Sequence, residues 1–179
     1  MRGVVRAACG ALFLAAAQPA YATVVDSAPG GFTVRQVVEV RGTAVDAYRT
    51  VVDRISAWWQ SDHTFSGNAS NLVLEARPGG CFCEALPGGG GVRHLTVVYA
   101  DPGKLLRLSG GLGPLQGLAV SGTMTWKFTE TGGRTTVELT YQVGGYAPEG
   151  LASLAPVVDA VLGTQVSRLK RLLDTGRPE

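Results

Sequence analysis

The stretch LASLAPVVDAVLGTQVSRLKRLL, residues 151–173, determines the fold expected for this chain of 179 residues. Its apolar residues recur at spacings of three and four, the pattern of an amphipathic helix with one buried stripe. The members of the stripe are Leu151, Leu154, Ala155, Val158, Val161, Leu162, Leu169 and Leu172. A stripe of this length needs a broad apolar surface to cover it, and the chain before it supplies strands.

The chain before this helix predicts about seven strands. Residues 32–40 alternate, with Phe32, Val34, Val38 and Val40 on one face, as in a half-buried strand. Six further strands are expected at residues 72–77, 81–86, 92–99, 104–109, 122–129 and 135–143. The turns between them are rich in Gly and Pro, which favours antiparallel hairpin connections.

A shorter helix is expected after the first strand. Thr43 stands three residues before Asp46, which is a start similar to a capping box. Apolar residues then follow at helical spacing, namely Val45, Tyr48, Val52, Ile55 and Trp59. By that spacing Trp59 continues the buried stripe, and Trp58 points partly away from it.

The first 22 residues have the features of a secretory signal peptide. Arg2 and Arg6 form a basic start, an apolar stretch follows at residues 7–17, and residues 20–22 read Ala-Tyr-Ala, a cleavage pattern. We expect cleavage near Ala22 and Thr23, a linker at residues 23–31, one domain at residues 32–174 and a tail at residues 175–179. The mature protein is then expected to be periplasmic or secreted.

Charge and hydropathy argue against two classes of partner. Residues 1–22 hold two of the 16 basic residues and none of the 14 acidic ones, so the remaining chain has 14 of each and a formal net charge of zero. Nucleic-acid binding needs a basic surface, and no segment approaches the roughly 20 apolar residues that span a bilayer. We expect no nucleic-acid partner, no stable membrane insertion, and a monomer or weak dimer.

The order of strand, helix, loop, six strands and long helix resembles the START-like (SRPBCC) superfamily across residues 32–173. Residues 78–82, PGGCF, are similar to a strand opening of its Aha-type branch, and residues 100–105, ADPGKL, to a hairpin of that branch. The resemblance implies an α+β helix-grip fold, a curved antiparallel sheet wrapped around a long C-terminal helix. Members of the superfamily bind lipids, sterols, hormones or polyketides, and others, such as polyketide cyclases, are enzymes.

One predicted hairpin contains the polar pair best suited to chemistry. If residues 81–99 pair symmetrically across their loop, Glu84 lies opposite His94 on the same face, about 5 Å away. Alternation favours Leu95, Val97 and Tyr99 as the buried residues, which leaves the pair facing solvent. The resemblance instead places Phe82, and therefore Glu84, toward the cavity. In that second arrangement Glu84 and His94 are candidates for an acid and base pair.

Further ligand-binding residues are expected on the sheet face that the last helix covers and on the helix itself. The full set is Trp59, Phe82, Glu84, His94, Met124, Trp126, Tyr141, Val158 and Leu162. A buried Tyr hydroxyl needs a hydrogen-bond partner, so Tyr141 is expected to orient a ligand, with plain core packing as the alternative. Residues 110–117, apolar within a Gly and Pro frame, form either a packed loop or a gate over the cavity.

No metal site or cofactor is expected. Cys81, Cys83, His63 and His94 are zinc-ligand types, but a Cys-x-Cys pair on one strand lacks the tight turn of a zinc knuckle. Side chains two residues apart on a regular strand are parallel and about 6.5 Å apart, too far for a disulfide. A regular strand therefore predicts free thiols.

Three functions fit these observations. The first is an exported, non-catalytic domain that binds a small hydrophobic or aromatic molecule between the sheet and the C-terminal helix. The second is an enzyme of the polyketide cyclase or aromatase kind, with Glu84 and His94 as acid and base. The third is an envelope protein that binds partners through the exposed sheet or the loop at residues 110–117.

Overall fold

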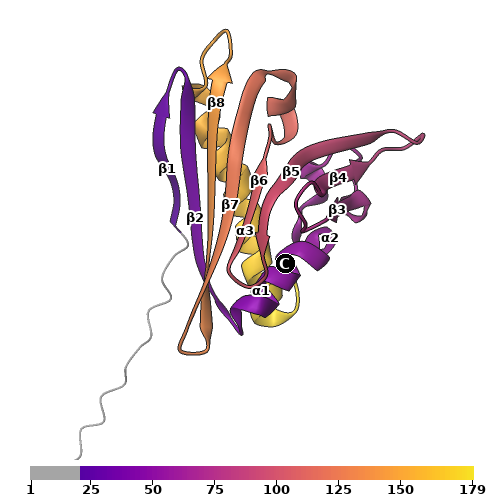
Figure 1. Cartoon of the computed structure of the whole chain (residues 1–179), viewed down its shortest axis with the longest axis vertical. Helices are drawn as coiled ribbons and strands as arrows, with labels where there is room; N and C mark the ends of the chain where they lie inside the picture. The colour runs from indigo at the N-terminus through magenta and orange to yellow at the C-terminus, as the bar shows by residue number, and fades with distance from the viewer. Residues whose placement is uncertain (1–20) are drawn as a thin grey trace, which may run out of the picture.

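The computed structural model describes residues 21–179. Eight antiparallel strands form one sheet in the order β1-β2-β8-β7-β6-β5-β4-β3 (Figure 1). The strands are β1 (Tyr21–Ala28), β2 (Gly31–Arg41), β3 (Leu72–Leu74), β4 (Cys81–Ala85), β5 (Gly91–Asp101), β6 (Leu105–Ser109), β7 (Ala119–Thr131) and β8 (Arg134–Tyr146). The α-helices are α1 (Ala44–Asp53), α2 (Ile55–Trp58) and α3 (Ala155–Thr175). Short 3-10 turns are η1 (Ser61–His63), η2 (Ala69–Asn71), η3 (Gly113–Gly117) and η4 (Ala152–Leu154).

The long helix α3 runs along one face of the sheet and packs most closely against β2 (Figure 1). Its stripe is buried as the sequence predicts at Leu162, Leu169 and Leu172. The helix ends at Gly176, whose positive φ of 80° supplies the left-handed cap that closes the last turn. The predicted α+β helix-grip arrangement is therefore confirmed.

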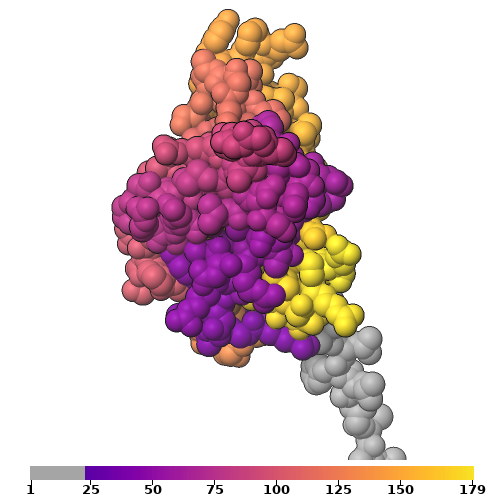
Figure 2. Space-filling view, turned by 90° about the vertical axis from the view of Figure 1, so that its right-hand side faces the viewer, coloured from indigo at the N-terminus to yellow at the C-terminus, as the bar shows by residue number. Residues whose placement is uncertain are grey.

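The remaining helices and the β3–β5 end of the sheet lie on the same side of the molecule. Figure 2 shows this side, with the chain from α1 to β5 (purple to magenta) covering most of it and the C-terminal end of α3 (yellow) emerging beside α1. No helix within residues 21–179 is both long and apolar enough to cross a membrane.

The first helix begins as predicted and ends earlier. The Thr43 side chain accepts a hydrogen bond from the Asp46 amide at 3.1 Å, so the predicted cap is confirmed. A single helix through residue 59 is wrong, because the backbone leaves the helical conformation at Arg54 and restarts as the single turn α2.

This break changes which side chains are buried. Trp58 and Trp59 are both buried, at 1% and 5% exposed, so the expectation that Trp58 points away is wrong. Their ring centroids are 5.5 Å apart, and the Trp58 indole N–H donates to the Thr50 carbonyl at 3.1 Å. Val45, expected in the buried stripe, is 41% exposed. The helical spacing counted along α1 does not carry across Arg54 to Trp58, whereas Val45 lies before the break, on a side of α1 that solvent reaches.

The eighth strand, β1, replaces most of the expected linker. Residues 23–28 belong to β1, which pairs with β2, and the turn at residues 29–30 follows. The Asp, Ser, Pro and Gly composition favoured a loop, but pairing with the free edge of β2 satisfies the backbone groups of these residues. The predicted signal peptide lies outside the described residues, apart from positions 21 and 22, and remains a prediction.

A bulge in β5 changes which residues of the hairpin face inward and which residues are paired. Phe82 pairs with Leu95 and Cys83 with Arg93, so His94 is an extra residue without a partner in the ladder. Because a bulge shifts the alternation by one, His94 and Leu95 both face inward. The predicted opposition of Glu84 and His94 in the ladder is wrong, since Glu84 pairs with Val92.

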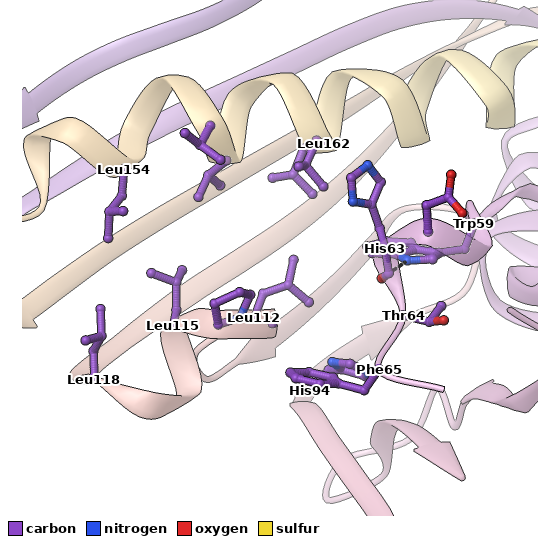
Figure 3. Close-up of a pocket in the computed structure, with 16 residues that line it drawn as sticks. Trp59, His63, Thr64, Phe65, His94, Leu112, Leu115, Leu118, Leu154 and Leu162 are labelled. Atoms are coloured by element: carbon purple, nitrogen blue, oxygen red, sulfur yellow. Dashed lines mark hydrogen bonds between the residues drawn. The ribbon is translucent and has the colours of Figure 1, made fainter. Parts of the chain in front are cut away.

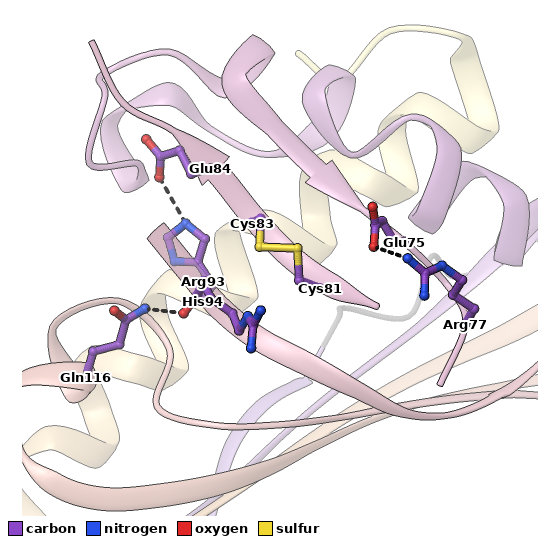
Figure 4. The surroundings of a disulfide bond; sticks show 8 residues. All are labelled: Glu75, Arg77, Cys81, Cys83, Glu84, Arg93, His94 and Gln116. Carbon is purple, nitrogen blue, oxygen red and sulfur yellow. Dashed lines mark hydrogen bonds and ion pairs between the residues drawn. A yellow bond between two sulfur atoms is a disulfide. The ribbon is translucent and has the colours of Figure 1, made fainter. Parts of the chain in front are cut away.

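The two cysteines opposite this bulge are bonded to each other. Cys81 and Cys83 form a disulfide, so the prediction of free thiols is wrong (Figure 4). Their Cα atoms are 5.4 Å apart, less than the about 6.6 Å that two residues span in a regular strand. The pairing of β4 with β5 is irregular between Phe82 and Cys83, and a Cα separation of this size lies within the range of disulfides.

Candidate functional site

A cavity of about 620 Å³ lies between α3 and two loops (Figure 3). We name these loops the 61–66 loop, which contains η1, and the 110–118 loop, which contains η3. The lining residues are Trp59, Asp62, His63, Thr64, Phe65, His94, Leu112, Gly113, Pro114, Leu115, Leu118, Leu154, Val157, Val158, Val161 and Leu162. The volume is within the range of sites that bind drug-sized molecules, about 300–1,000 Å³.

Helix α3 and the 110–118 loop form the apolar part of the cavity. They face each other in Figure 3, with Leu162 on the helix, Leu154 immediately before it, and Leu115 and Leu118 on the loop. The helix stripe is less buried here than farther along, because the cavity takes the place of packed side chains. Val157 is 61% exposed, which places it at the opening to solvent.

The polar groups of the cavity are gathered at its other end, where the 61–66 loop meets β5. Asp62, His63, Thr64 and His94 line this end beside Trp59. The Trp59 indole N–H donates to the His63 carbonyl at 2.9 Å, so this tryptophan both lines the cavity and holds the loop (Figure 3). Within residues 21–179, no group of three or more metal-ligating side chains could hold a metal ion.

A buried hydrogen bond to Glu84 holds the His94 ring in place. Its Nε2 is 2.9 Å from Oε2 of Glu84, and their side chains are 4% and 0% exposed (Figure 4). The Glu84 carboxylate also accepts the backbone N–H of Phe65 at 3.1 Å and that of Ser66. The contact that the sequence predicted therefore exists, but as a diagonal one, because Glu84 pairs with Val92 and His94 lies two residues farther along the same face of β5.

These contacts shift the pKa of each partner. Burial alone raises the pKa of Glu84, but hydrogen bonds from Ser66, Phe65 and His94 outweigh it, and the pKa lies below its usual value. Burial lowers the pKa of His94, and the bond to Glu84 only partly opposes this effect. Near neutral pH the pair is therefore a carboxylate and a neutral imidazole.

Tyr141 of β8 holds the 110–118 loop. Its hydroxyl accepts the Leu112 N–H and donates to the Gly110 carbonyl, both at 2.9 Å. The ring lies against Gly122, where an added Cβ would be 2.5 Å from a ring carbon. Burial raises the pKa of Tyr141 to about 12, against a lowering effect of the Leu112 hydrogen bond.

The structure divides the predicted ligand-binding residues into two groups. Trp59, His94, Val158 and Leu162 line the cavity. The other five, all buried and outside the lining, are Phe82, Glu84, Met124, Trp126 and Tyr141.

Packing and hydrogen bonds explain why four of these five lie outside the cavity. Phe82 stands behind its wall, with its ring centroid 5.2 Å from Trp59 and 4.8 Å from His94. Trp126 packs edge-on against Trp58 at 5.9 Å in the core. Side chains from α1 and α2 therefore fill the space over the central strands that the sequence assigned to a ligand, while Glu84 and Tyr141 hold loops.

Sequence reasoning missed most of the two loop walls. The sequence marks His63 only as a zinc-ligand type, and no pattern in it marks Asp62, Thr64 and Phe65 as lining residues. The 110–118 loop did carry a signal, since Leu112, Leu115 and Leu118 are apolar within a Gly and Pro frame. Of the two alternatives for this loop, it is packed against Tyr141 and also forms a wall of the cavity.

Solved structures of other proteins share this architecture. CalU16 from Micromonospora echinospora aligns with a TM-score of 0.60 at 15% identity, covering 90% of this chain and 88% of that one. The chain has the helix-grip fold of START-like proteins. The chain also resembles in fold the Aha1 dimer from Colwellia psychrerythraea (TM-score 0.54, 15% identity, 80% of this chain and 97% of that one covered). DynU16, a protein of the dynemicin biosynthetic locus, aligns with a TM-score of 0.57 at 22% identity, covering 82% of this chain and 48% of that one.

Comparisons of sequence add no closer relationship. No family model matches the chain, and no curated protein matches it. At these identities the structural likeness establishes the START-like fold, and the function has to be argued from the cavity.

Proposed function

We propose that the protein is an exported START-like domain that binds a small hydrophobic or aromatic molecule in the cavity between α3 and the two loops. The observation that carries the proposal is the cavity itself, about 620 Å³ in volume and lined mainly by aliphatic and aromatic side chains. A pocket of this kind stabilises a ligand chiefly by removing its apolar surface from water.

The position of the cavity on α3 supports binding over simple imperfect packing. Val158 and Val161 are only half-buried on a helix whose later residues Leu169 and Leu172 are buried. Tightly packed interiors leave few voids larger than a water molecule. An apolar hollow of this volume beside an otherwise well-packed core is a feature suited to an apolar guest.

Filling the cavity tests this proposal. The variant Val158→Trp adds an indole to the lining, and Ala160→Trp adds the same group at an exposed position of α3 outside the lining. We expect the fluorescent probe N-phenyl-1-naphthylamine to bind the wild type and Ala160→Trp with one-to-one stoichiometry, and to bind Val158→Trp at least about tenfold more weakly because the void is occupied. Equal binding by all three proteins contradicts the proposed site.

A second function, catalysis, is favoured by one observation, the contact of a buried His and Glu pair with the cavity wall. Only His94 of the pair lines the cavity. In an enzyme of the polyketide cyclase or aromatase kind, His94 is then the base facing the substrate, and Glu84 orients it. Mass spectrometry of a molecule that co-purifies with the protein separates the two functions: an unchanged molecule indicates a carrier, and a His94-dependent change of mass during incubation indicates an enzyme.

A further inference from the structure

The His94 ring has two nitrogens with different surroundings. Nε2 is bound to Glu84 at 2.9 Å, whereas Nδ1 is buried and has no hydrogen-bond partner among residues 21–179. Figure 4 shows Nδ1 on the side of the ring away from Glu84. Buried polar atoms are nearly always hydrogen-bonded in folded proteins, and each exception calls for an explanation.

The partner of Nε2 determines what Nδ1 can bind. An ionised carboxylate only accepts hydrogen bonds, so Nε2 must carry the proton that it donates to Glu84. In a neutral imidazole the other nitrogen is then an acceptor with a free lone pair. The two backbone N–H groups that also bind Glu84 keep its charge in place and thereby fix this tautomer.

We propose that the ligand of the cavity is an aromatic molecule with a neutral hydroxyl group, of the phenol type, which donates a hydrogen bond to Nδ1 of His94. This inference rests on the proposed binding function and deepens it by naming the ligand class. It joins two observations at one place, a buried acceptor without a partner and an apolar cavity that the same ring lines.

The surroundings of His94 favour an aromatic body for the group that carries the hydroxyl. The Phe65 ring is stacked on His94 at a centroid distance of 5.8 Å, and Trp59 lines the same end of the cavity. Flat rings pack well against such side chains. Phe65 is 55% exposed, so it is the cover of His94 with the most freedom to turn aside when a ligand reaches the ring.

Two naphthalene derivatives provide the test, because they differ at a single group. The hydroxyl of 2-naphthol donates a hydrogen bond, and the methoxy group of 2-methoxynaphthalene does not. Each is titrated as a competitor of N-phenyl-1-naphthylamine at pH 7.5. We expect wild type to prefer 2-naphthol by about tenfold, the effect of one buried hydrogen bond.

Two variants test whether His94 is the side chain that causes the preference for 2-naphthol. His94→Phe keeps a ring and removes the acceptor, so it should bind the two compounds equally. His63→Gln alters the other cavity histidine and should keep the preference. Loss of the preference in His63→Gln, with retention in His94→Phe, overturns the assignment.

Nuclear magnetic resonance tests the same point in the wild type, independent of how well a variant folds. Long-range nitrogen correlations of the His94 ring should show a protonated Nε2 and an unprotonated Nδ1 at pH 7.5, with the Nδ1 signal shifting when 2-naphthol is added. A protonated Nδ1, or equal affinities of the two compounds for wild type, overturns this inference and leaves the proposed function standing. Failure of both compounds and of the probe to bind overturns both.

Discussion

The two loops that wall the cavity are both anchored to the sheet by a buried side chain, which is charged for one loop and neutral for the other. In each case a buried polar side chain of the sheet hydrogen-bonds to loop backbone. The 61–66 loop is held by Glu84, an ionised carboxylate that accepts two backbone N–H groups. The 110–118 loop is held by Tyr141, a neutral hydroxyl that accepts one bond and donates another.

The two anchors differ in what else they contact. Glu84 also binds His94, a titratable residue of the cavity lining, whereas Tyr141 hydrogen-bonds only to its own loop. Glu84 is shared between the 61–66 loop and His94, so that loop, the charge and the imidazole form one network. Tyr141 is satisfied entirely by the loop it holds, and its raised pKa of about 12 keeps it neutral under ordinary conditions. Charged hydrogen bonds are also the stronger kind.

The largest effect should come from removing the charge that holds the 61–66 loop. In Glu84→Gln, the amide nitrogen faces an N–H donor where the carboxylate offered an acceptor, and hydrogen bonds to a buried charge are worth about 1.5–3 kcal/mol each. We expect the free energy of unfolding at pH 7.5 to fall by about 3 kcal/mol, as measured by urea denaturation. Amide hydrogen exchange should accelerate at Phe65 and Ser66 and stay unchanged at Leu112.

An exposed carboxylate in an ion pair is the matched control. Glu138 bonds to Arg35 on the sheet surface, with the two side chains 31% and 48% exposed. Glu138→Gln should cost less than about 1 kcal/mol, as exposed pairs generally do. If the two variants lose equal stability, Glu84 is not the special anchor that its contacts suggest.

The second effect concerns the other loop. Tyr141→Phe removes one donor and one acceptor and leaves the ring in place against Gly122. The Leu112 N–H and the Gly110 carbonyl then lose a partner, so we expect a loss of about 1–2 kcal/mol. Hydrogen exchange should accelerate at Leu112 and not at Phe65. Faster exchange in both loops would show that the two walls are coupled rather than held independently.

The architecture could be predicted from the sequence because the periodicity of long elements is strong. Helix α3 and seven of the eight strands follow from apolar spacing and from Gly and Pro in the turns. The failures lie where tertiary contacts override local signals. β1 consists of loop-forming residues that pair with the edge of β2, and α1 breaks at Arg54 without a proline or glycine to announce it.

The candidate site was less predictable, because it depends on a bulge and on loops. Alternation along β5 predicts that His94 and Leu95 face opposite sides, and only the bulge brings both inward. The size and the face of large residues such as Trp126 predict that they line the cavity. The sequence does not reveal that Tyr48 of α1 packs on Phe128 and that Trp58 of α2 packs on Trp126, which fills the space over these strands.

The smallest expected effect is a loss of stability in mild acid. In the wild-type protein it should affect the 61–66 loop and leave the 110–118 loop unchanged. The pKa of His94 is lowered by burial in the folded protein, so the unfolded chain, with its His pKa of about 6.5, binds a proton first as the pH falls. Stability should therefore decrease from about pH 6.5 downward, by at most about 1.4 kcal/mol per pH unit for one proton. Glu84, whose pKa is also lowered, adds a loss of the same sign below its usual pKa.

Tyr141 has the opposite dependence, because a raised pKa means that the unfolded chain loses its proton first, and only above about pH 10. Between pH 7.5 and 5.5, hydrogen exchange corrected for its intrinsic pH dependence should therefore rise in the 61–66 loop and stay constant in the 110–118 loop. Urea unfolding of wild type and His94→Phe at pH 7.5, 6.5 and 5.5 supplies the control, since the variant should lose the slope that His94 contributes. If the free energy of unfolding has the same pH slope in both proteins, the acid response does not arise from His94. The network of Glu84 and His94 then gives the 61–66 loop no acid sensitivity that the 110–118 loop lacks.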